Sequence, residues 1–198
     1  LGLDYNLASS NSAWNGKFFY HHSFDEDEHD GGQYAQGAHL EYKTRNIGVS
    51  FAQTSVGTDY NAEVGFVRRK GYNFLGPSFS YTWVPNKKIV AHGVFAESEN
   101  FYDTEFRKID HEQTVGYNFE FKSRATAQIG WLDFYVHLLE DFDPTHKNDV
   151  YLPAGSEYRY GGAWVEYASD NRKNLKWSGS YTKGTFYNGH IDLVEGML

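Results

Sequence analysis

The chain has 198 residues, a formal net charge of −8 and no cysteine. This length suits one domain or a large part of one, and the lack of cysteine excludes disulfide scaffolds, thiolate metal sites and cysteine nucleophiles. The acidic balance disfavours nucleic acid as a partner, because the chain has no pervasive basic surface to neutralise phosphates.

Alternation of apolar and polar residues is the main pattern along the chain. It runs through residues 33–43, 47–53, 78–83, 114–122 and 175–182. A period of two residues is typical of strands with one apolar and one polar face. We count about eleven such strands, the last beginning near His190. Between Gln128 and Leu138 the alternation changes phase, which predicts a β-bulge.

Connections of two lengths alternate between these strands. Short turns fall at residues 9–12, 44–46, 85–87, 123–124 and 169–173, and longer segments at about 24–32, 56–73, 98–111, 140–156 and 184–189. In an antiparallel up-and-down meander this order gathers the short turns at one end and the long loops at the other. Bacterial outer-membrane barrels have that asymmetry.

The polar strand faces are built from Gly, Ser, Thr, Asn, Gln, Glu and Lys. Such groups would make a poor protein core, since each buried polar group without a partner costs about 1–3 kcal/mol, but they suit a water-filled lumen. The apolar faces would then meet lipid between girdles of Tyr, Trp and Phe. We therefore predict an all-β fold, an antiparallel up-and-down meander forming a transmembrane outer-membrane β-barrel. The alternative is a soluble sandwich with an aromatic core.

The strand number predicts an incomplete barrel. Bacterial single-chain barrels have an even number of strands and no open edge, and the final segment HIDLVEGML lacks the closing aromatic residue that such barrels often carry. We expect residues 1–198 to form a single β-barrel segment that is incomplete at both ends and belongs to a larger barrel.

The stretch HHSFDEDEHD, residues 21–30, concentrates acidic residues in the first longer segment. Carboxylate oxygens suit calcium, but the EF-hand spacing does not fit, since counting from Asp25 puts Asp30 where the loop needs glycine. We predict a solvated acidic surface loop. Metal binding is the alternative. The expected ion is calcium, with these ligands: Asp25, Asp27, Glu28 and Asp30; the three histidines of the stretch would suit a transition metal.

The segment GTDYNAEVGFVRRK, residues 57–70, places Arg68, Arg69 and Lys70 among otherwise acidic loops. One interpretation is a loop that packs on the barrel rim or folds inward as a plug. The other is a lumen constriction in which the basic residues contact an anionic ligand.

Charges also separate between the two ends. Basic residues fall in or beside the short turns: Arg45, Lys87, Lys88, Arg124, Arg172 and Lys173. Acidic residues fall mainly in the longer segments. Basic turns would suit a leaflet with phosphate headgroups.

Catalytic templates do not match. The chain has no G-x-S-x-G elbow, no P-loop and no H-E-x-x-H, because His111-Glu112 is followed by Gln-Thr-Val. We predict that the protein is not an enzyme, with an outer-membrane barrel hydrolase as the remaining enzymatic class.

Three stretches carry a family resemblance: TDYNAEVGFVRRKGYN (58–73), a strand ending in Trp83-Val84-Pro85, and YLPAGSEYRYGGAWVEYASDNRKNLKWSGSYTKGTFYNG (151–189). They resemble an uncharacterised bacterial family that pairs an N-terminal domain like carbohydrate-binding family 9 with a large C-terminal outer-membrane β-barrel. The resemblance covers most of the chain, all of it from within the barrel. It implies an envelope location and a glycan link through the N-terminal domain, and it supplies no catalytic residues.

The functional prediction follows from the barrel. We expect a segment of a bacterial outer-membrane protein that acts as a channel, a transporter or a surface-assembly component, with its long loops extracellular. Expected partners are outer-membrane lipid, glycans through that N-terminal domain, and other envelope proteins. The alternative is a soluble or surface-exposed β-sandwich that binds carbohydrate through Tyr and Trp.

Overall fold

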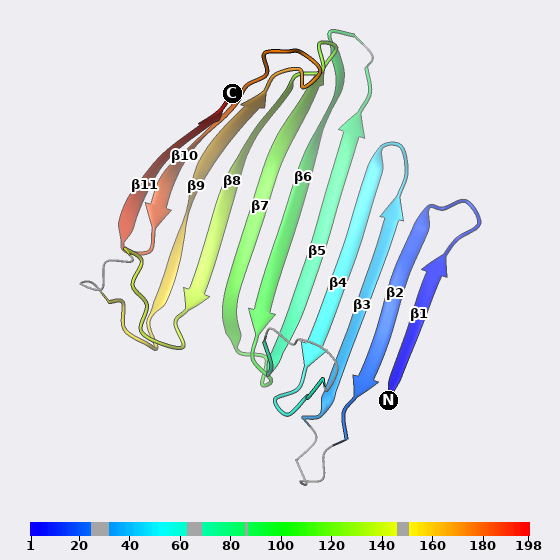
Figure 1. The fold of residues 1–198 in the computed structure, drawn as a ribbon, viewed down its shortest axis with the longest axis vertical. Coiled ribbons are helices and arrows are strands. Elements are labelled where there is room, and N and C mark those ends of the chain that lie inside the picture. The colour runs from blue at the N-terminus through cyan, green and yellow to red at the C-terminus, as the bar shows by residue number, and fades with distance from the viewer. Residues whose placement is uncertain (25–31, 63–68, 86, 146–150) are drawn as a thin grey trace. The chain divides into compact units, whose positions relative to one another are not determined.

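The computed structural model describes residues 1–24, 32–62, 69–85, 87–145 and 151–198. Eleven strands follow one another in a single sheet whose spatial order is the chain order (Figure 1). They are β1 (Gly2–Ala8), β2 (Trp14–His22), β3 (Tyr34–Lys43), β4 (Ile47–Val56), β5 (Tyr72–Trp83), β6 (Ile89–Tyr102), β7 (Lys108–Phe121), β8 (Thr126–His137), β9 (Glu157–Ala168), β10 (Ser178–Phe186) and β11 (Gly189–Met197).

The all-β, antiparallel up-and-down fold with eleven strands is confirmed. Within the described residues β1 pairs only with β2, and β11 only with β10, so the sheet is not closed. Closure into a barrel therefore stays a prediction. No helix in the described ranges is long and apolar enough to cross a membrane.

The chain divides into two compact units. Unit 1 consists of Leu1–Tyr81 and Glu97–Lys108, and unit 2 of Thr82–Ala96 and Ile109–Leu198. In each unit we call the end with the connections β1–β2, β3–β4, β5–β6, β7–β8 and β9–β10 the turn end, and the opposite end the loop end.

Hydroxyl side chains close several connections at the turn ends. Ser9 Oγ accepts a hydrogen bond from the N–H of Trp14 at 2.9 Å, and Thr44 Oγ1 accepts one from the N–H of Ile47 at 3.1 Å. Ser169 does the same for Trp177 at 2.8 Å. A hydroxyl that follows one strand thus holds the first residues of the next strand, as Ser and Thr do in turns.

The predicted alternation of short and long connections is wrong at three places. Residues 98–111 are mostly strand, and only residues 103–107 connect β6 to β7. Residues 184–189 form a hairpin in which Phe186 pairs with Gly189, and Tyr187 adopts φ +49°. At the turn end, the β9–β10 connection is longer than predicted and covers residues 169–177.

The predicted bulge in β8 is also wrong. Thr126–His137 pairs with β9 without interruption, and Thr126–Val136 pairs with β7 in the same way. The phase change has another cause: Ile129 and Trp131 lie on one face of the strand, whereas Phe134 and Val136 lie on the other. Apolar side chains change face along a strand of constant register.

Few hydrophobic side chains are buried. Among the described residues the buried ones are Ala35, Val56, Ile109, Ala125, Leu138 and Leu152, and no side chain is fully enclosed. Exposed large hydrophobic residues include Val49, Phe51 and Phe79 in unit 1 and Val115, Ile129 and Trp131 in unit 2, so each unit leaves apolar side chains uncovered.

Candidate functional site

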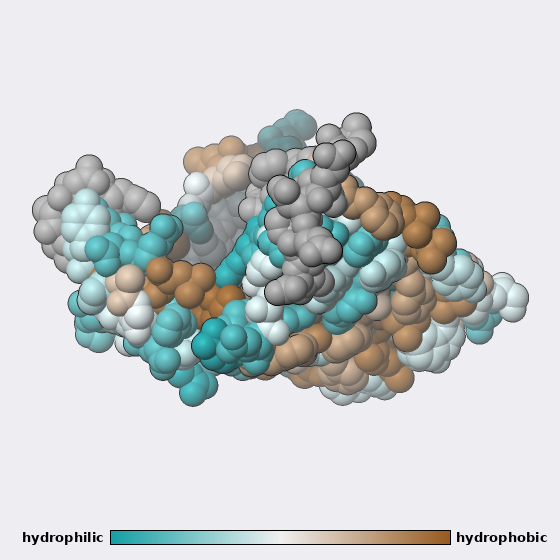
Figure 2. Space-filling view, turned by 90° about the horizontal axis from the view of Figure 1, so that it is seen from below, coloured by the Kyte–Doolittle hydropathy of each residue, from teal (hydrophilic) through white to brown (hydrophobic). Residues whose placement is uncertain are grey.

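The apolar face of unit 1 is exposed. Strand register sets Trp14, Tyr42, Val49 and Phe79 side by side in a row across β2–β5. The next row contains Gly16, Leu40, Phe51 and Pro77. Val49, Phe51 and Phe79 are all exposed. Figure 2 shows hydrophobic side chains gathered in one area on the side where Figure 1 draws these strands.

Unit 2 repeats this arrangement. Tyr117, Ile129, Val165, Tyr181 and Val194 form a row across β7–β11. The neighbouring row begins with Val115 and Trp131. Val115 and Ile129 are each 53% exposed and Trp131 is 54% exposed, although all three are large hydrophobic side chains. Such contiguous exposed apolar surface marks an interaction with a partner or a lipid phase.

Aromatic rings border these rows at the turn ends. In unit 1 the ring centroids of Trp14 and Tyr42 lie 4.8 Å apart. In unit 2 those of Tyr167 and Trp177 lie 4.7 Å apart. Rings that are apolar in body and polar at one edge are characteristic of membrane–water interfaces.

The opposite face of each unit is small and polar. In unit 1, Ser50 Oγ and Ser78 Oγ are hydrogen-bonded at 2.7 Å. In unit 2 this face carries only negative charge between residues 109 and 197, because register and alternation place these carboxylates on it and no lysine or arginine: Asp110, Glu112, Glu120, Glu166 and Glu195. We call this surface the polar face.

Aromatic rings on the polar face lie over glycines of the neighbouring strand. A Cβ atom at Gly130 would lie 2.8 Å from Nε1 of its cross-strand partner Trp164. A Cβ atom at Gly37 would lie 2.3 Å from Cε1 of its partner Phe19. Only glycine leaves room for these rings to lie flat on the sheet, an arrangement that protects the glycine backbone.

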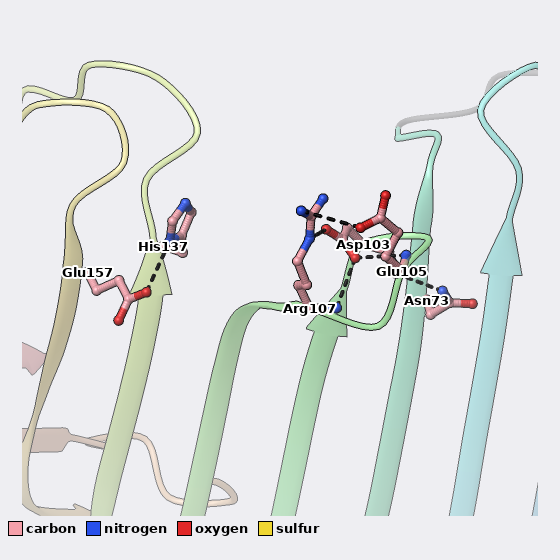
Figure 3. Close-up of polar contacts among 6 residues, drawn as sticks. All are labelled: Asn73, Asp103, Glu105, Arg107, His137 and Glu157. Carbon is pink, nitrogen blue, oxygen red and sulfur yellow. Dashed lines mark hydrogen bonds and ion pairs between the residues drawn. The ribbon is translucent and has the colours of Figure 1, made fainter.

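A charged cluster ends the apolar face of unit 2 at its loop end. Asp133 occupies the position that follows Trp131 on the same face. Its carboxylate accepts hydrogen bonds from Arg159 Nε and Nη2, each at 3.0 Å, and lies 3.0 Å from His111 Nε2. His111 is buried. A second pair, His137 Nδ1 and Glu157 Oε1, lies 3.4 Å apart (Figure 3).

Unit 1 has the neutral side chains Ser55 and Asn73 at the corresponding position, and their hydrogen bonds lead to the backbone of Asp103, whose carboxylate pairs with Arg107. Ser55 Oγ donates to Asn73 Oδ1 at 2.6 Å, and Asn73 Nδ2 donates to the carbonyl oxygen of Asp103 at 2.8 Å (Figure 3). Both Ser55 and Asn73 are buried. Arg107 Nε donates to Asp103 Oδ2 at 2.6 Å. Desolvation acts to raise the pKa of Asp103, but hydrogen bonds from the Arg107 side chain and from the N–H groups of Arg107 and Glu105 together hold that pKa below its usual range.

At the loop end of each unit, polar side chains replace the apolar ones on the exposed apolar face, and aromatic rings lie on the polar face. In unit 2, Tyr160 stacks on Phe134 at 5.2 Å and on Tyr187 at 4.8 Å. In unit 1, Phe74 packs on Phe101 at 5.0 Å. The sequence reasoning missed these clusters, although the phase change between Gln128 and Leu138 was their signal.

The structure describes only some of the candidate site residues predicted from the sequence. The guanidinium of Arg69 lies over the rings of Tyr72 and Phe101, at 5.9 and 5.6 Å from their centroids, and Lys70 is exposed. Arg68 lies outside the described residues. The four carboxylates considered for calcium, Asp25, Asp27, Glu28 and Asp30, also lie outside them. Elsewhere in the described ranges no group of three or more His, Asp or Glu residues is placed to hold a metal ion.

Comparison of the chain with protein-family models, with curated proteins and with solved structures finds no match. The resemblance noted in the sequence therefore stays a prediction.

Proposed function

We propose that this chain is part of a bacterial outer-membrane β-barrel in which the exposed apolar faces contact lipid and the polar faces line a water-filled lumen. The observation that carries the proposal is the exposed apolar rows in each unit, together with the polar residues on the opposite faces. The protein would act as a channel, a transporter or a surface-assembly component, with its loop end extracellular.

The energetics of exposure favour lipid as the covering phase. Burial of a Val, Leu, Ile or Phe side chain stabilises by about 1.5–3 kcal/mol, and the apolar rows leave that stabilisation unused in water. An apolar layer over the polar faces would instead be unfavourable, because it would remove water from their serine, threonine, asparagine and glutamate side chains. Lipid on one face and water on the other satisfies both.

The charged cluster of unit 2 supports a boundary for the lipid layer. Trp131 and Asp133 are two residues apart, a separation of about 7 Å along a strand. Because charged side chains are costly within hydrocarbon, Asp133 and Arg159 would lie at headgroup level. The Lys183–Asp192 pair, which strand register places in the row of Trp131, would lie there too, so the row of Ile129 is the first inside the hydrocarbon. Strands β5–β9 have 12 to 14 residues, more than the roughly 9–11 that a crossing needs, which leaves room for an extracellular extension.

The carbohydrate-binding alternative has one supporting observation, the exposed Trp and Tyr side chains. However, these rings share their rows with aliphatic residues such as Ile129 and Val165, which sugars do not require. A sandwich also needs a second sheet to cover the first, whereas the described strands form one sheet.

Tryptophan fluorescence tests the proposal, because Trp131 and Trp164 lie on opposite faces. Two variants would keep only one of these tryptophans, with the other tryptophans changed to Phe. In vesicles whose acyl chains carry bromine, a fluorescence quencher, the emission of Trp131 should be strongly quenched. The emission of Trp164, which lies over Gly130 on the polar face, should change little.

Equal behaviour of the two variants would overturn the proposed assignment of the faces. A chain that stays in the aqueous phase, does not float with vesicles and migrates identically on gels with and without boiling would favour the soluble alternative. Planar-bilayer conductance of the inserted protein would then separate an open channel from a scaffold.

A further inference from the structure

The turn end of unit 2 carries a group of basic residues whose ligand the proposed function does not name. Three connections gather there: residues 84–88, 122–125 and 169–177. We name five of their basic side chains the basic turn surface, and all five residues are exposed: Lys87, Lys88, Lys122, Arg124 and Lys176.

Backbone contacts bring these connections together. The N–H of Lys122 donates to the carbonyl oxygen of Lys88 at 3.0 Å, which joins the first two connections. Thr126 pairs with Ala168, which places the second connection beside the third. The five charges therefore belong to one surface and are not scattered over the unit.

Little negative charge opposes this surface. Asp170 is the one carboxylate in the three connections, and Arg172 already holds it through Nε–Oδ1 and Nη2–Oδ2 contacts of 2.9 Å each. The ion pairs of the described residues include none of the five basic side chains. The loop end of the same unit is acidic in contrast, with Glu140, Asp141 and Asp143.

Apolar and aromatic surface lies directly beside these charges. An open pocket of about 450 Å³ is lined by Pro85, Lys87, Lys88, Ile89 and His92. The His92 ring stacks on Trp83 at 5.5 Å and is hydrogen-bonded to the Tyr117 hydroxyl. A second pocket of about 200 Å³ joins Lys176 to apolar neighbours that include Trp177, Met197 and Leu198.

We propose that the basic turn surface binds the phosphate groups of anionic phospholipids in the leaflet that meets the turn end. The inference rests on the proposed membrane function and names the lipid class that the unit selects. The ammonium and guanidinium groups would contact the phosphodiester of the lipid. The rings of Trp83 and Trp177 would lie at the depth of the glycerol backbone, and the apolar rows would contact the acyl chains. Charge complementarity alone would suit a lipid phosphate and a soluble anion equally. The apolar wall beside the lysine side chains of each pocket favours the phospholipid.

The test uses the full chain in detergent. Binding of phosphatidylglycerol, of phosphatidylcholine with identical acyl chains, and of glycerol phosphate alone would be measured by native mass spectrometry and by titration. Phosphatidylglycerol should bind tightest and glycerol phosphate weakest. The double variant Lys87→Gln/Lys88→Gln should weaken phosphatidylglycerol binding by about 25-fold, from about fivefold for each basic residue at a membrane surface.

Two control variants each remove one basic residue that lies outside the basic turn surface. Arg45→Gln removes a basic residue from the turn end of unit 1. Lys183→Gln removes a strand lysine whose Nζ lies 3.6 Å from Asp192 Oδ1. Both variants, alone and combined as Arg45→Gln/Lys183→Gln to match the two charges that the double variant removes, should leave phosphatidylglycerol binding within about twofold of the unmodified chain, because neither side chain lines the two pockets beside the basic turn surface.

Four results would overturn the inference. Equal binding of the two phospholipids would remove the headgroup preference while leaving the membrane proposal intact. Competition by glycerol phosphate as strong as by the whole lipid would indicate a site for free anions. A double variant that binds like the controls would remove the assigned residues. Failure to associate with any lipid would overturn both this inference and the proposed function.

Discussion

Units 1 and 2 share one pattern of polarity and differ in their charges. In both, an exposed apolar face runs from the turn end and gives way to a polar network, while the opposite face changes from small polar residues to aromatic ones. In unit 1 that network is formed by the neutral side chains of Ser55 and Asn73. Negative charge on its polar face has nearby partners: Lys17 Nζ lies 4.0 Å from Asp4 Oδ1, and His21 Nε2 lies 3.2 Å from Asp4 Oδ2.

Unit 2 separates its charges instead. Its polar face between residues 109 and 197 is acidic only, its turn end is basic, and its apolar face ends in the ionic cluster around Asp133. The shared pattern is the one that the proposed placement between lipid and water would require of every strand. The charge separation is particular to unit 2, so selectivity for lipid or solute is expected to depend on that unit.

The largest effect should come from a charge placed on the apolar face. Ile129→Arg in unit 2 and Val49→Arg in unit 1 should each destabilise the inserted protein by about 2–4 kcal/mol, the cost of arginine on the lipid side of a barrel. Gln128→Arg, one residue away on the polar face, is the control and should cost much less. Urea unfolding in lipid vesicles measures the free energy of unfolding of all three variants. A large loss in Gln128→Arg together with no loss in Ile129→Arg would show that the two faces are assigned the wrong way round.

The two loop-end networks should respond differently to salt. Asp133→Asn removes the carboxylate that Arg159 and His111 share and should cost about 1–2 kcal/mol, less at high ionic strength because salt screens exposed charges. Asn73→Ala leaves a buried Ser55 hydroxyl without its acceptor and should cost about 1–3 kcal/mol at any ionic strength. Denaturant unfolding at low and high salt separates them; identical salt dependence would contradict the ionic and neutral assignments.

A smaller effect is expected at Arg69 in unit 1. Arg69→Gln removes a cation that lies over two rings and should lower the free energy of unfolding by about 0.5–1 kcal/mol. Arg69→Lys keeps the charge and serves as the control. Ion selectivity in planar bilayers adds the functional comparison: a loss of anion preference in Arg69→Gln alone would assign the residue to a constriction, and unchanged selectivity would assign it to packing.

The smallest effect should be a local loss of stability at low pH around Asp170. The Arg172 side chain and backbone lower the pKa of Asp170 from 3.8 to about 2. The carboxylate is therefore ionised and paired above pH about 4, and its contribution is lost as the pH falls from about 4 towards 2. Protection of the amides in residues 169–177, taken as the exchange rate relative to the intrinsic rate at each pH, should fall over that range. Asp170→Asn should show low protection at every pH, and protection that stays constant across the same range in the unmodified chain would contradict the pairing.

The sequence predicted the strands because their alternation is local. Rows such as Ile47, Val49 and Phe51 are visible in the printed letters, and a period of two residues has no other regular structure to satisfy it. The basic turn residues Lys87, Lys88 and Arg124 were visible in the same way. The predicted bulge in β8 failed because a phase change has two explanations, an inserted residue or an exchange of faces, and only register distinguishes them.

What the sequence determined by itself is therefore the strand order, the two-faced pattern and the charge of each connection, since each depends on residues close together in the chain. Cross-strand register decided the rest. It brought His111, Asp133 and Arg159 from three strands into one cluster, set Trp164 over Gly130, and joined the turns through Lys122 and Lys88. These pairings depend on hydrogen bonds between residues more than 20 positions apart, and no local pattern specifies which residues will meet.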